Sequence, residues 1–200
     1  MGIENARNGK LLYHLTKAEN IDSIMNYGLL PRKVILENSI TFGDVADREI
    51  ISKRTELGLD GYTPFHFHPY SAFDVAVKHS NNSQNMLYIC IDRDLARLNH
   101  FKILPRHPLS EFEVELYEYD EGYSLIDWDT MEEKGRTDNE AREVKMAECL
   151  TDLIVPPSCF KCIYVPNQEV KDIVEATMEK HDVSFPPPYV DVQDVWFNAD

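Results

Sequence analysis

The hydrophobic pattern near the N-terminus predicts a strand followed by a helix. Residues 11–15 form a short apolar run that is typical of a strand. Thr16 follows this run and Glu19 lies three positions later, which is the pattern of a helix capping box. An apolar stripe of helical period comes next, and Gly28 suits the position just beyond the end of a helix. We therefore expect a helix over residues 17–27, with Thr16 as its N-cap.

Short strands and short helices alternate along the rest of the chain. Phe65 and Phe67 alternate with histidines, which predicts a strand, and Ser71 is placed to cap the helix after it. Residues 143–151 fit either a helix or a strand. We also expect strands at residues 86–91, 101–104 and 160–165, and helices at residues 44–57, 72–79, 93–98 and after Asn167. This mixture predicts an α+β class in one domain over residues 1–200.

The negative charge of the chain is concentrated in one segment. The 200 residues carry a formal net charge of −15 at pH 7. Residues 111–143 hold 13 acidic and 3 basic side chains, a net charge of −10. Because this segment is also rich in aromatic residues, we expect an acidic insertion or flap with partial order instead of a disordered linker. A proline-rich C-terminal tail over residues 183–200 is expected to be extended.

This charge balance argues against a protein that grips long duplex DNA, because such proteins have a basic surface. No apolar stretch approaches the roughly 18 residues of a transmembrane helix, and residues 1–10 lack the apolar core of a signal peptide. We therefore expect a cytoplasmic protein with no membrane partner. A short single strand or a single nucleotide remains compatible with a local basic site at Arg32, Lys33, Arg48, Lys53 and Arg54.

Cysteine and histidine spacings offer two candidate metal sites, and neither is favoured. Cys159 and Cys162 form a single CxxC without a second pair, so we prefer two buried thiols of a strand. His66 and His68 have the HxH spacing of metal ligands, but no third ligand lies at a telling offset. A strand whose aromatic and histidine side chains line a polar pocket is the preferred interpretation, and we expect no metal ion.

Three separated features, the His14/Thr16 pair, Arg54 and Glu148, are each ambiguous alone but suggest a function in combination. His14 and Thr16 are equally well explained as a structural histidine and a helix cap. Arg54 carries a guanidinium suited to a diphosphate, although an exposed helix residue is the simpler alternative. Glu148 lies in an apolar run, where a buried carboxylate is costly unless it is paired or functional, and the alternative is an exposed residue at the edge of an element.

A His-x-Thr pair, then an Arg, then a late Glu are the parts that an NAD-consuming ADP-ribosyltransferase needs, in that order. The ribose carbon that loses nicotinamide acquires oxocarbenium character, as at other glycosidic centres. A carboxylate can hold the ribose hydroxyl, stabilise this positive charge and accept a proton from the attacking nucleophile. This chemistry assigns the central role to Glu148.

Four stretches of the chain resemble, in the same order, the DarT family of DNA ADP-ribosyltransferase toxins. They are residues 13–30, which begin with Tyr-His-Leu-Thr; residues 44–54, which end at Arg54; residues 62–67, which read Tyr-Thr-Pro-Phe-His-Phe; and residues 147–150, which read Ala-Glu-Cys-Leu. A Val-Pro pair follows the last stretch, as it does in the family. The similarity spans roughly residues 11–165.

The resemblance implies an ADP-ribosyltransferase-like fold, a split and mostly antiparallel β-sheet with surrounding helices and NAD in the cleft. It implies that NAD is the donor of ADP-ribose, that Glu148 and Arg54 are catalytic, and that the acceptor is thymine or guanine in single-stranded DNA. It also implies a toxin–antitoxin system with a macrodomain antitoxin that removes the modification. The residues implied to bind NAD are His14, Thr16, Asn20, Gly28 and Arg54.

Residues 65–71 depart from the family pattern, because His66 replaces a Tyr and Tyr70 replaces an Arg. The departures bear on the acceptor and favour guanine slightly over thymine. We take His66, His68 and Ser71 as candidate residues of the acceptor pocket. The alternatives are a transferase that acts on RNA, a protein or a small molecule, a metal-dependent enzyme built on the two histidines, and a non-catalytic NAD-binding module.

Overall fold

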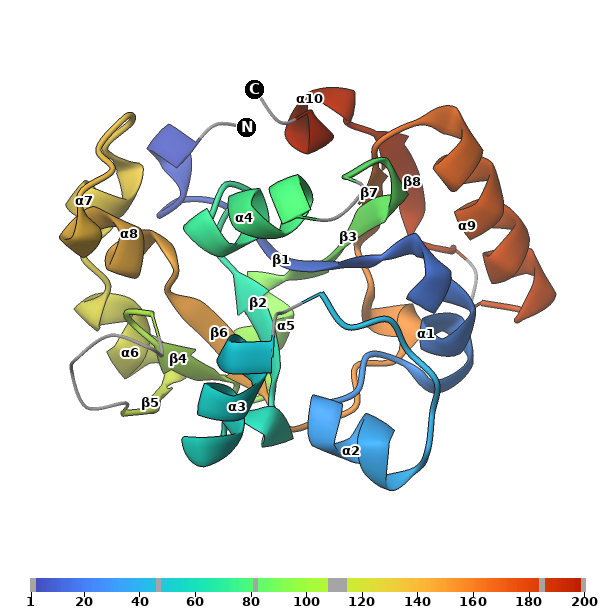
Figure 1. Ribbon diagram of the computed structural model, residues 1–200, viewed down its shortest axis with the longest axis horizontal. Helices are drawn as coiled ribbons and strands as arrows, with labels where there is room; N and C mark the ends of the chain where they lie inside the picture. Colours follow the sequence, from blue (N-terminus) through green and yellow to red (C-terminus); the bar gives the residue numbers. More distant parts are fainter. Residues whose placement is uncertain (1–2, 46–47, 81–82, 108–114, 184–185, 199–200) are drawn as a thin grey trace.

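An eight-stranded sheet runs through the computed structural model, which describes residues 3–45, 48–80, 83–107, 115–183 and 186–198 (Figure 1). The strand order is β5-β4-β6-β2-β1-β3-β7-β8, and the pairs are antiparallel except for β7–β8. The α+β class with a mostly antiparallel sheet is therefore confirmed. The strands are β1 Leu11–Lys17, β2 Thr63–His66, β3 Met86–Asp92, β4 Lys102–Leu104, β5 Tyr117–Glu118, β6 Glu148–Thr151, β7 Cys162–Val165 and β8 Tyr189–Val192.

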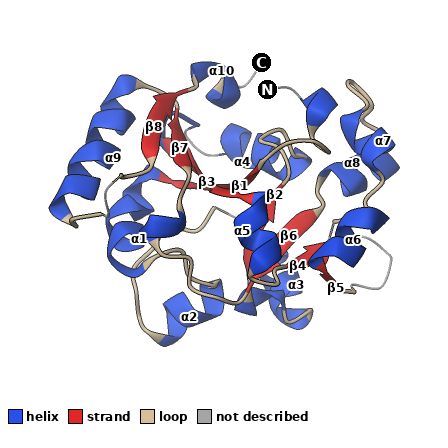
Figure 2. Ribbon diagram, turned by 180° about the vertical axis from the view of Figure 1, so that it is seen from behind, coloured by secondary structure: helices blue, strands red, loops and turns tan. Residues whose placement is uncertain are grey.

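Helices lie on both faces and at both ends of this sheet. In Figure 1, α4 lies in front of the sheet, while in the reverse view of Figure 2 α5 lies in front of it. None of the helices in the described ranges combines the length and the apolar character that a membrane span requires. The helices are α1 Ile21–Tyr27, α2 Arg32–Glu37, α3 Arg48–Glu56, α4 Ala72–Ser80, α5 Arg93–Leu98, α6 Tyr119–Leu125, α7 Trp128–Glu132, α8 Asn139–Lys145, α9 Gln168–Lys180 and α10 Asp194–Phe197.

The two faces of the central strands pack into separate apolar clusters. Leu12 of β1 belongs to a large cluster that includes side chains of α1, α5 and α9. Tyr13, its neighbour on the opposite face, belongs to a second cluster with Val77 of α4 and Trp196 of α10. Because β3 is covered on both faces, its first six residues are all buried, which explains its uninterrupted apolar sequence.

The sheet is weakest between its two central strands. β1 pairs with β3 along seven consecutive residues, but it pairs with β2 only where Tyr13 faces His66. Pro64 of β2 has no N–H to offer β1, which suits an incompletely paired edge. The two strands diverge beyond this point, and the opening between them is the split that the resemblance implies.

The start of the first helix differs from its prediction. Thr16 is not a helix N-cap, because β1 continues through Thr16 and Lys17, which face Leu87 and Met86 of β3. A 3-10 turn, η2 (Ala18–Asn20), then leads into α1. Pairing with β3 therefore outweighs the local capping signal. The predicted end is confirmed, since Gly28 has φ 84° and its N–H donates to the Ile24 carbonyl.

The predicted helix over residues 44–57 is shorter than expected. α3 begins at Arg48 and ends at Glu56, and Asp44 and Val45 precede it in an irregular segment. Residues 46–47 lie outside the described ranges. α2, which was not predicted, precedes this segment and carries no fully buried residue. Its marginal burial explains why its sequence lacks a clear apolar stripe.

The ambiguous residues 143–151 contain the end of α8 and all of β6. β6 is buried at every position, so it lacks the alternation by which a half-buried strand is recognised. The described part of the acidic segment, residues 115–143, forms β5, α6, α7 and most of α8 at one end of the sheet (Figure 1). Trp128 and Met131 from this segment are buried in the main cluster. Residues 108–114 lie outside the described ranges, and the insertion or flap stays a prediction.

The C-terminal tail packs against the rest of the protein. β8 adds a parallel strand to β7, and α10 follows it. Trp196 and Phe197 of α10 are buried against Tyr88 of β3. The extended conformation predicted for this tail therefore applies to β8, while the last described turn is helical.

Candidate functional site

A pocket opens along the divergence of β1 and β2. One wall consists of residues 13–16 of β1, and the other consists of residues 62–64 and His66 at β2. Glu148 of β6 and Arg54 of α3 line the same pocket. The remaining wall is mostly apolar and comes from the segment that follows α1 and from the first turn of α3. Its apolar side chains are Leu29, Leu30, Ile35, Ile40, Phe42, Val45, Ile50 and Ile51.

His14 stands at the mouth of the split with a defined tautomer. Its Nδ1 lies 2.8 Å from the carbonyl oxygen of Pro64. Because a carbonyl oxygen only accepts, Nδ1 must carry the proton and donate it. Burial lowers the pKa of His14 below its ordinary value of 6.5, so the ring is neutral at pH 7. Nε2 is then an acceptor, which suits a hydroxyl donor such as a ribose.

Thr16 and Asn20 connect β1 to the apolar wall. The Asn20 amide nitrogen donates to Thr16 Oγ1 at 3.0 Å and to the Gly43 carbonyl at 2.9 Å. The Gly43 N–H in turn donates to Asn20 Oδ1 at 2.6 Å. Both amide protons of Asn20 are thus used within the protein, and this buried side chain fixes the segment around Gly43 over the pocket.

Gly28 lies in the wall where two distant segments meet. Leu29 and Val155 form an isolated antiparallel bridge, and their N–H groups donate to each other's carbonyls at 2.9 and 3.0 Å. A Cβ at position 28 would lie 2.8 Å from the Val155 carbonyl oxygen, and φ is 84° there. Only glycine allows both this close approach and this backbone conformation without strain.

Glu148 and Arg54 form a buried ion pair at the end of the pocket. Arg54 Nη1 donates to both carboxylate oxygens of Glu148 at 2.9 Å. The Arg54 side chain is 15% exposed and the Glu148 side chain is 7% exposed, so solvent screens the pair little. Arg54 Nη2 is buried and has no hydrogen-bond partner within the described residues. This unused donor belongs to a pocket-lining residue, where a bound anion would satisfy it.

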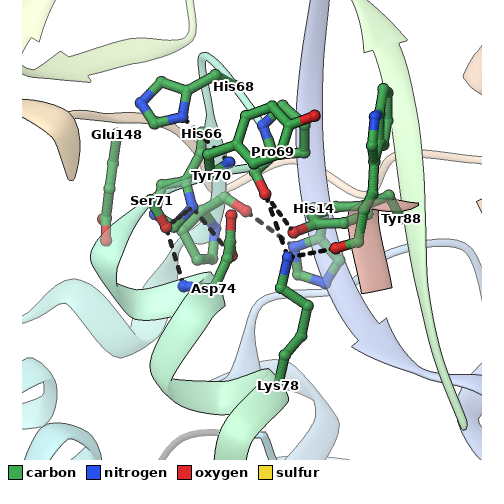
Figure 3. A network of polar contacts seen from close by, with 12 residues as sticks. His14, His66, His68, Pro69, Tyr70, Ser71, Asp74, Lys78, Tyr88 and Glu148 are labelled. Atoms are coloured by element: carbon green, nitrogen blue, oxygen red, sulfur yellow. Dashed lines mark hydrogen bonds and ion pairs between the residues drawn. The ribbon is translucent and has the colours of Figure 1, made fainter. Parts of the chain in front are cut away.

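His66, which lies opposite Glu148 across the strands, is held by the start of α4, as Figure 3 shows with Ser71 and Asp74. Its Nδ1 lies 3.1 Å from Ser71 Oγ and 3.4 Å from Asp74 Oδ1. Ser71 caps α4, as predicted, because its Oγ accepts from the Asp74 N–H at 3.0 Å. Burial alone would lower the pKa of His66, but the Asp74 carboxylate opposes this and holds that pKa above 6.5. Burial raises the pKa of Asp74, but His66 outweighs it and holds that pKa below 3.8.

A buried lysine fixes the loop that precedes α4. Lys78 Nζ donates to the Trp196 carbonyl at 2.7 Å and to the Pro69 carbonyl at 3.4 Å. The Tyr88 hydroxyl also donates to the Pro69 carbonyl at 2.9 Å. These contacts tie the loop between His66 and Ser71 to α10 and β3 (Figure 3).

His68 does not share the environment of His66. The strand ends at His66, and the chain then turns so that His68 Nδ1 accepts from the Tyr70 N–H at 3.1 Å. Burial lowers the pKa of His68 to about 3, so it is neutral. His68 and Ser71 are both buried, and neither is among the pocket-lining residues, unlike His66. Within the described residues, no cluster of three or more His, Cys, Asp or Glu side chains has the arrangement of a metal site.

Sequence reasoning missed two ionisable residues of this site, Asp74 and His107. Asp74 lies three residues after the cap in a Ser-x-x-Asp pattern, which gives no sign that its carboxylate is fully buried. His107 lines the pocket and follows β4 without any local motif. By contrast, the structure brings His14, Thr16, Asn20, Gly28, Arg54, His66 and Glu148 into one pocket.

Solved structures share this fold. Thermus sp. 2.9 DarT in complex with ADP-ribosylated ssDNA superposes with a TM-score of 0.80 at 19% identity, covering 96% of this chain and 97% of that chain. The same DarT in complex with NAD+ gives 0.75 at 18% identity, covering 94% and 98%. Thermosipho africanus DarTG in complex with ADP-ribose gives 0.74 at 20% identity, covering 94% of this chain and 51% of that chain.

Sequence comparison gives the family directly. No curated protein matches the chain significantly. A family model described as "ssDNA thymidine ADP-ribosyltransferase, DarT" matches residues 13–197, which confirms the resemblance. Because this match extends over nearly the whole chain, the protein belongs to the DarT family of ssDNA thymidine ADP-ribosyltransferases.

Proposed function

We propose that the protein transfers ADP-ribose from NAD to thymine in single-stranded DNA. The observation that carries this proposal is the buried Glu148–Arg54 pair at the end of a pocket whose mouth holds a neutral His14. The description of the family names thymidine, so thymine takes precedence over guanine as the expected base. A DarT from Thermus sp. 2.9 with NAD+ and with ADP-ribosylated ssDNA supports both substrates by analogy.

NAD would occupy the pocket between the neutral histidine and the carboxylate. His14 Nε2 would accept a hydrogen bond from a ribose hydroxyl, since Nδ1 is committed to Pro64. Arg54 Nη2, which has no partner within the described residues, would donate to a phosphate oxygen. The apolar wall would cover the donor, and Asn20 would act through Gly43 by holding that wall in place.

The transfer breaks one glycosidic bond and forms another. The bond between the ribose C1′ and the nicotinamide nitrogen breaks, and its electron pair leaves with neutral nicotinamide. Glu148 stabilises the positive charge that develops at the ribose carbon. In thymidine the ring N–H is at N3, so N3 attacks C1′ and its proton passes to Glu148 and then to water.

The test is a transfer assay with base-deficient DNA. The protein is incubated with NAD and four single-stranded oligonucleotides, each lacking one base, and the adducts are read by mass spectrometry. We expect an ADP-ribose adduct that disappears with the thymine-free strand and with Glu148→Ala. An adduct lost only with the guanine-free strand would move the acceptor to guanine. NAD consumption without any DNA adduct would move it to RNA, a protein or a small molecule.

We also propose that the protein is a toxin whose modification a macrodomain antitoxin removes. The support is membership of the family and the match to half of the Thermosipho africanus DarTG chain. Expression of the wild-type chain is expected to stop bacterial growth, and Glu148→Ala is expected to relieve the arrest. Co-expression of an ADP-ribose-removing macrodomain should restore growth, and persistent arrest with unmodified DNA would contradict the proposal.

A further inference from the structure

His66 and Glu148 are direct neighbours across two strands. In the antiparallel pairing of β2 with β6, His66 lies opposite Glu148. Side chains of directly opposed residues extend from the same face of a sheet and come close enough to interact. Both residues line the pocket and both are buried, with exposed fractions of 7% and 5%. Glu148 therefore has two basic neighbours, Arg54 from α3 and His66 from β2.

The start of α4 holds His66 in one orientation and favours its charged form. Ser71 Oγ and Asp74 Oδ1 both lie near His66 Nδ1, at 3.1 and 3.4 Å. The Asp74 carboxylate is fully buried, and neither oxygen has a hydrogen bond of normal geometry within the described residues. A buried carboxylate without a cationic neighbour is costly. An imidazolium at position 66 removes this cost and adds positive charge beside Glu148.

The charged and titratable groups that face His66 come from every element around it. Asp74 and Glu148 favour its protonated form, while Arg54 and burial oppose it. His14, His68 and His107 also face it, and burial lowers the pKa of all three, so they are neutral near pH 7. The two carboxylates are therefore the groups that decide the charge of His66.

We propose that His66, held by Ser71 and Asp74, is a positioning residue whose charge holds the Glu148 carboxylate in place in the pocket. The need for such a residue follows from the position of Arg54, which faces the pocket with an unsatisfied Nη2. An incoming diphosphate competes with Glu148 for this guanidinium. His66 is a second cation beside the carboxylate, from the neighbouring strand β2, and its place does not depend on how the donor engages Arg54. This inference rests on the proposed transferase reaction.

The ratio of wild-type to His66→Gln turnover, measured from pH 6 to pH 9.5, tests this role. Gln retains a polar side chain of similar size but carries no charge. We expect kcat to fall about tenfold at pH 6, the effect of one pKa unit of interaction, while KM for NAD changes little. As pH rises through the pKa of His66, the wild type also loses its cation, so the ratio should approach one.

His68→Gln is the matched control. It makes the same substitution at a buried histidine two residues away, outside the pocket lining. Because His68 is neutral throughout this pH range, its ratio to wild type is expected to be the same at every pH. A His66→Gln ratio that is equally flat would overturn the positioning role, since a structural defect has no reason to follow the charge of His66.

Asp74→Asn provides a second variant that leaves the imidazole in place. Asn has nearly the same shape, and the backbone bond from residue 74 to Ser71 does not depend on the carboxylate. Without the carboxylate, burial dominates and His66 loses its proton at a lower pH. On the acid side of the wild-type His66 midpoint, turnover of this variant should fall toward that of His66→Gln. Wild-type turnover there would contradict the proposal.

A titration of the histidine ring nitrogens by NMR separates this inference from the proposed reaction. The Glu148 carboxylate favours the protonated form of His66, so removing its charge should lower the pKa of His66. The His66 midpoint should therefore fall in Glu148→Gln and in Asp74→Asn, but not in His68→Gln. If the wild type transfers nothing to DNA, the proposed function fails, but the NMR titration still tests whether His66 and Glu148 interact. A His66 midpoint that is unchanged in Glu148→Gln would refute the positioning role of His66.

Discussion

The two ends of the pocket are built in different ways. The end that holds Glu148, Arg54 and His66 is formed by paired strands, and its charges are buried and compensated. The other end is formed by α2 and irregular chain, its apolar side chains are half-exposed, and it is held by Asn20 and by an Arg32–Asp44 pair. Bond cleavage needs fixed charges, whereas a donor must enter and leave. The contrast is between preorganised charges at one end of the pocket and a half-exposed apolar wall at the other.

The largest effect is expected at the end of the pocket that holds Glu148. Glu148→Gln removes the charge that stabilises the oxocarbenium-like centre and the base that accepts the proton. We expect turnover to fall by about three orders of magnitude, within the range for a general base combined with charge stabilisation. Adduct formation by mass spectrometry measures the rate, and thermal unfolding checks the fold. Glu140→Gln, at an exposed glutamate of α8, is the control. A variant with more than a tenth of wild-type turnover would contradict the assignment.

Asn20→Ala tests how the two ends are joined. The substitution leaves the N–H and the carbonyl of Gly43 without their side-chain partner, which costs about 1–3 kcal/mol of unfolding free energy for a buried group. KM for NAD is expected to rise about tenfold while kcat changes less. Steady-state kinetics and urea unfolding measure the two effects. Asn38→Ala, which removes an exposed helix-end bond to Val34, should leave KM unchanged. A larger effect on kcat than on KM would contradict the role of Asn20 in holding the wall that covers the donor.

The pH dependence of NAD binding tests the role of His14, which belongs to neither end of the pocket. The pKa of His14 is lowered, so the ring is neutral above 6.5 and NAD affinity should be constant there. Below the lowered pKa, Nε2 becomes protonated and can no longer accept from a hydroxyl, so affinity should fall. Calorimetric titration with NAD gives the profile. His14→Gln retains an acceptor and should bind more weakly but without this acid limb. An acid limb that persists in the variant would assign the titration to another group.

The smallest effect is expected at the half-exposed apolar end of the pocket, which α2 and the chain after it form. The Arg32–Asp44 pair has a 2.8 Å contact, but both side chains are 31% exposed, and such pairs contribute about 0–1 kcal/mol. Arg32→Ala should therefore change KM for NAD less than about fivefold, the change that corresponds to about 1 kcal/mol. Lys33→Ala provides the comparison at the adjacent position. A tenfold rise in KM for Arg32→Ala alone would make this residue part of the donor site.

Local signals in the sequence predicted the features that local chemistry decides. Ser71 caps α4, Asn167 caps α9, and Gly28 ends α1, because each depends on a few neighbouring backbone groups. The Thr16 prediction was wrong for the opposite reason, since the decisive partner is Leu87, far away in the sequence. Local capping and tertiary strand pairing competed for the same residue.

The site residues that could be predicted from the sequence are those whose side-chain type the chemistry requires. Glu148 was suspected because a carboxylate in an apolar run needs a partner, and the structure supplies Arg54. The role of Asp74 was not predictable, because a capping aspartate and a buried counter-ion have the same sequence pattern. Whether a side chain at the start of a helix faces solvent or the sheet depends on how the whole domain is assembled.

The place of β6 in the sheet has a consequence for biosynthesis. β6 lies between β4 and β2, yet it leaves the ribosome after both, and Glu148 follows Arg54 by 94 residues. A nascent chain that ends before β6 lacks Glu148 and the strand that pairs with both β2 and β4. Chains fold as they emerge, and long-range strand pairings form late. Under the proposed function, a chain whose translation stops short of this strand lacks the catalytic carboxylate and has no transferase activity.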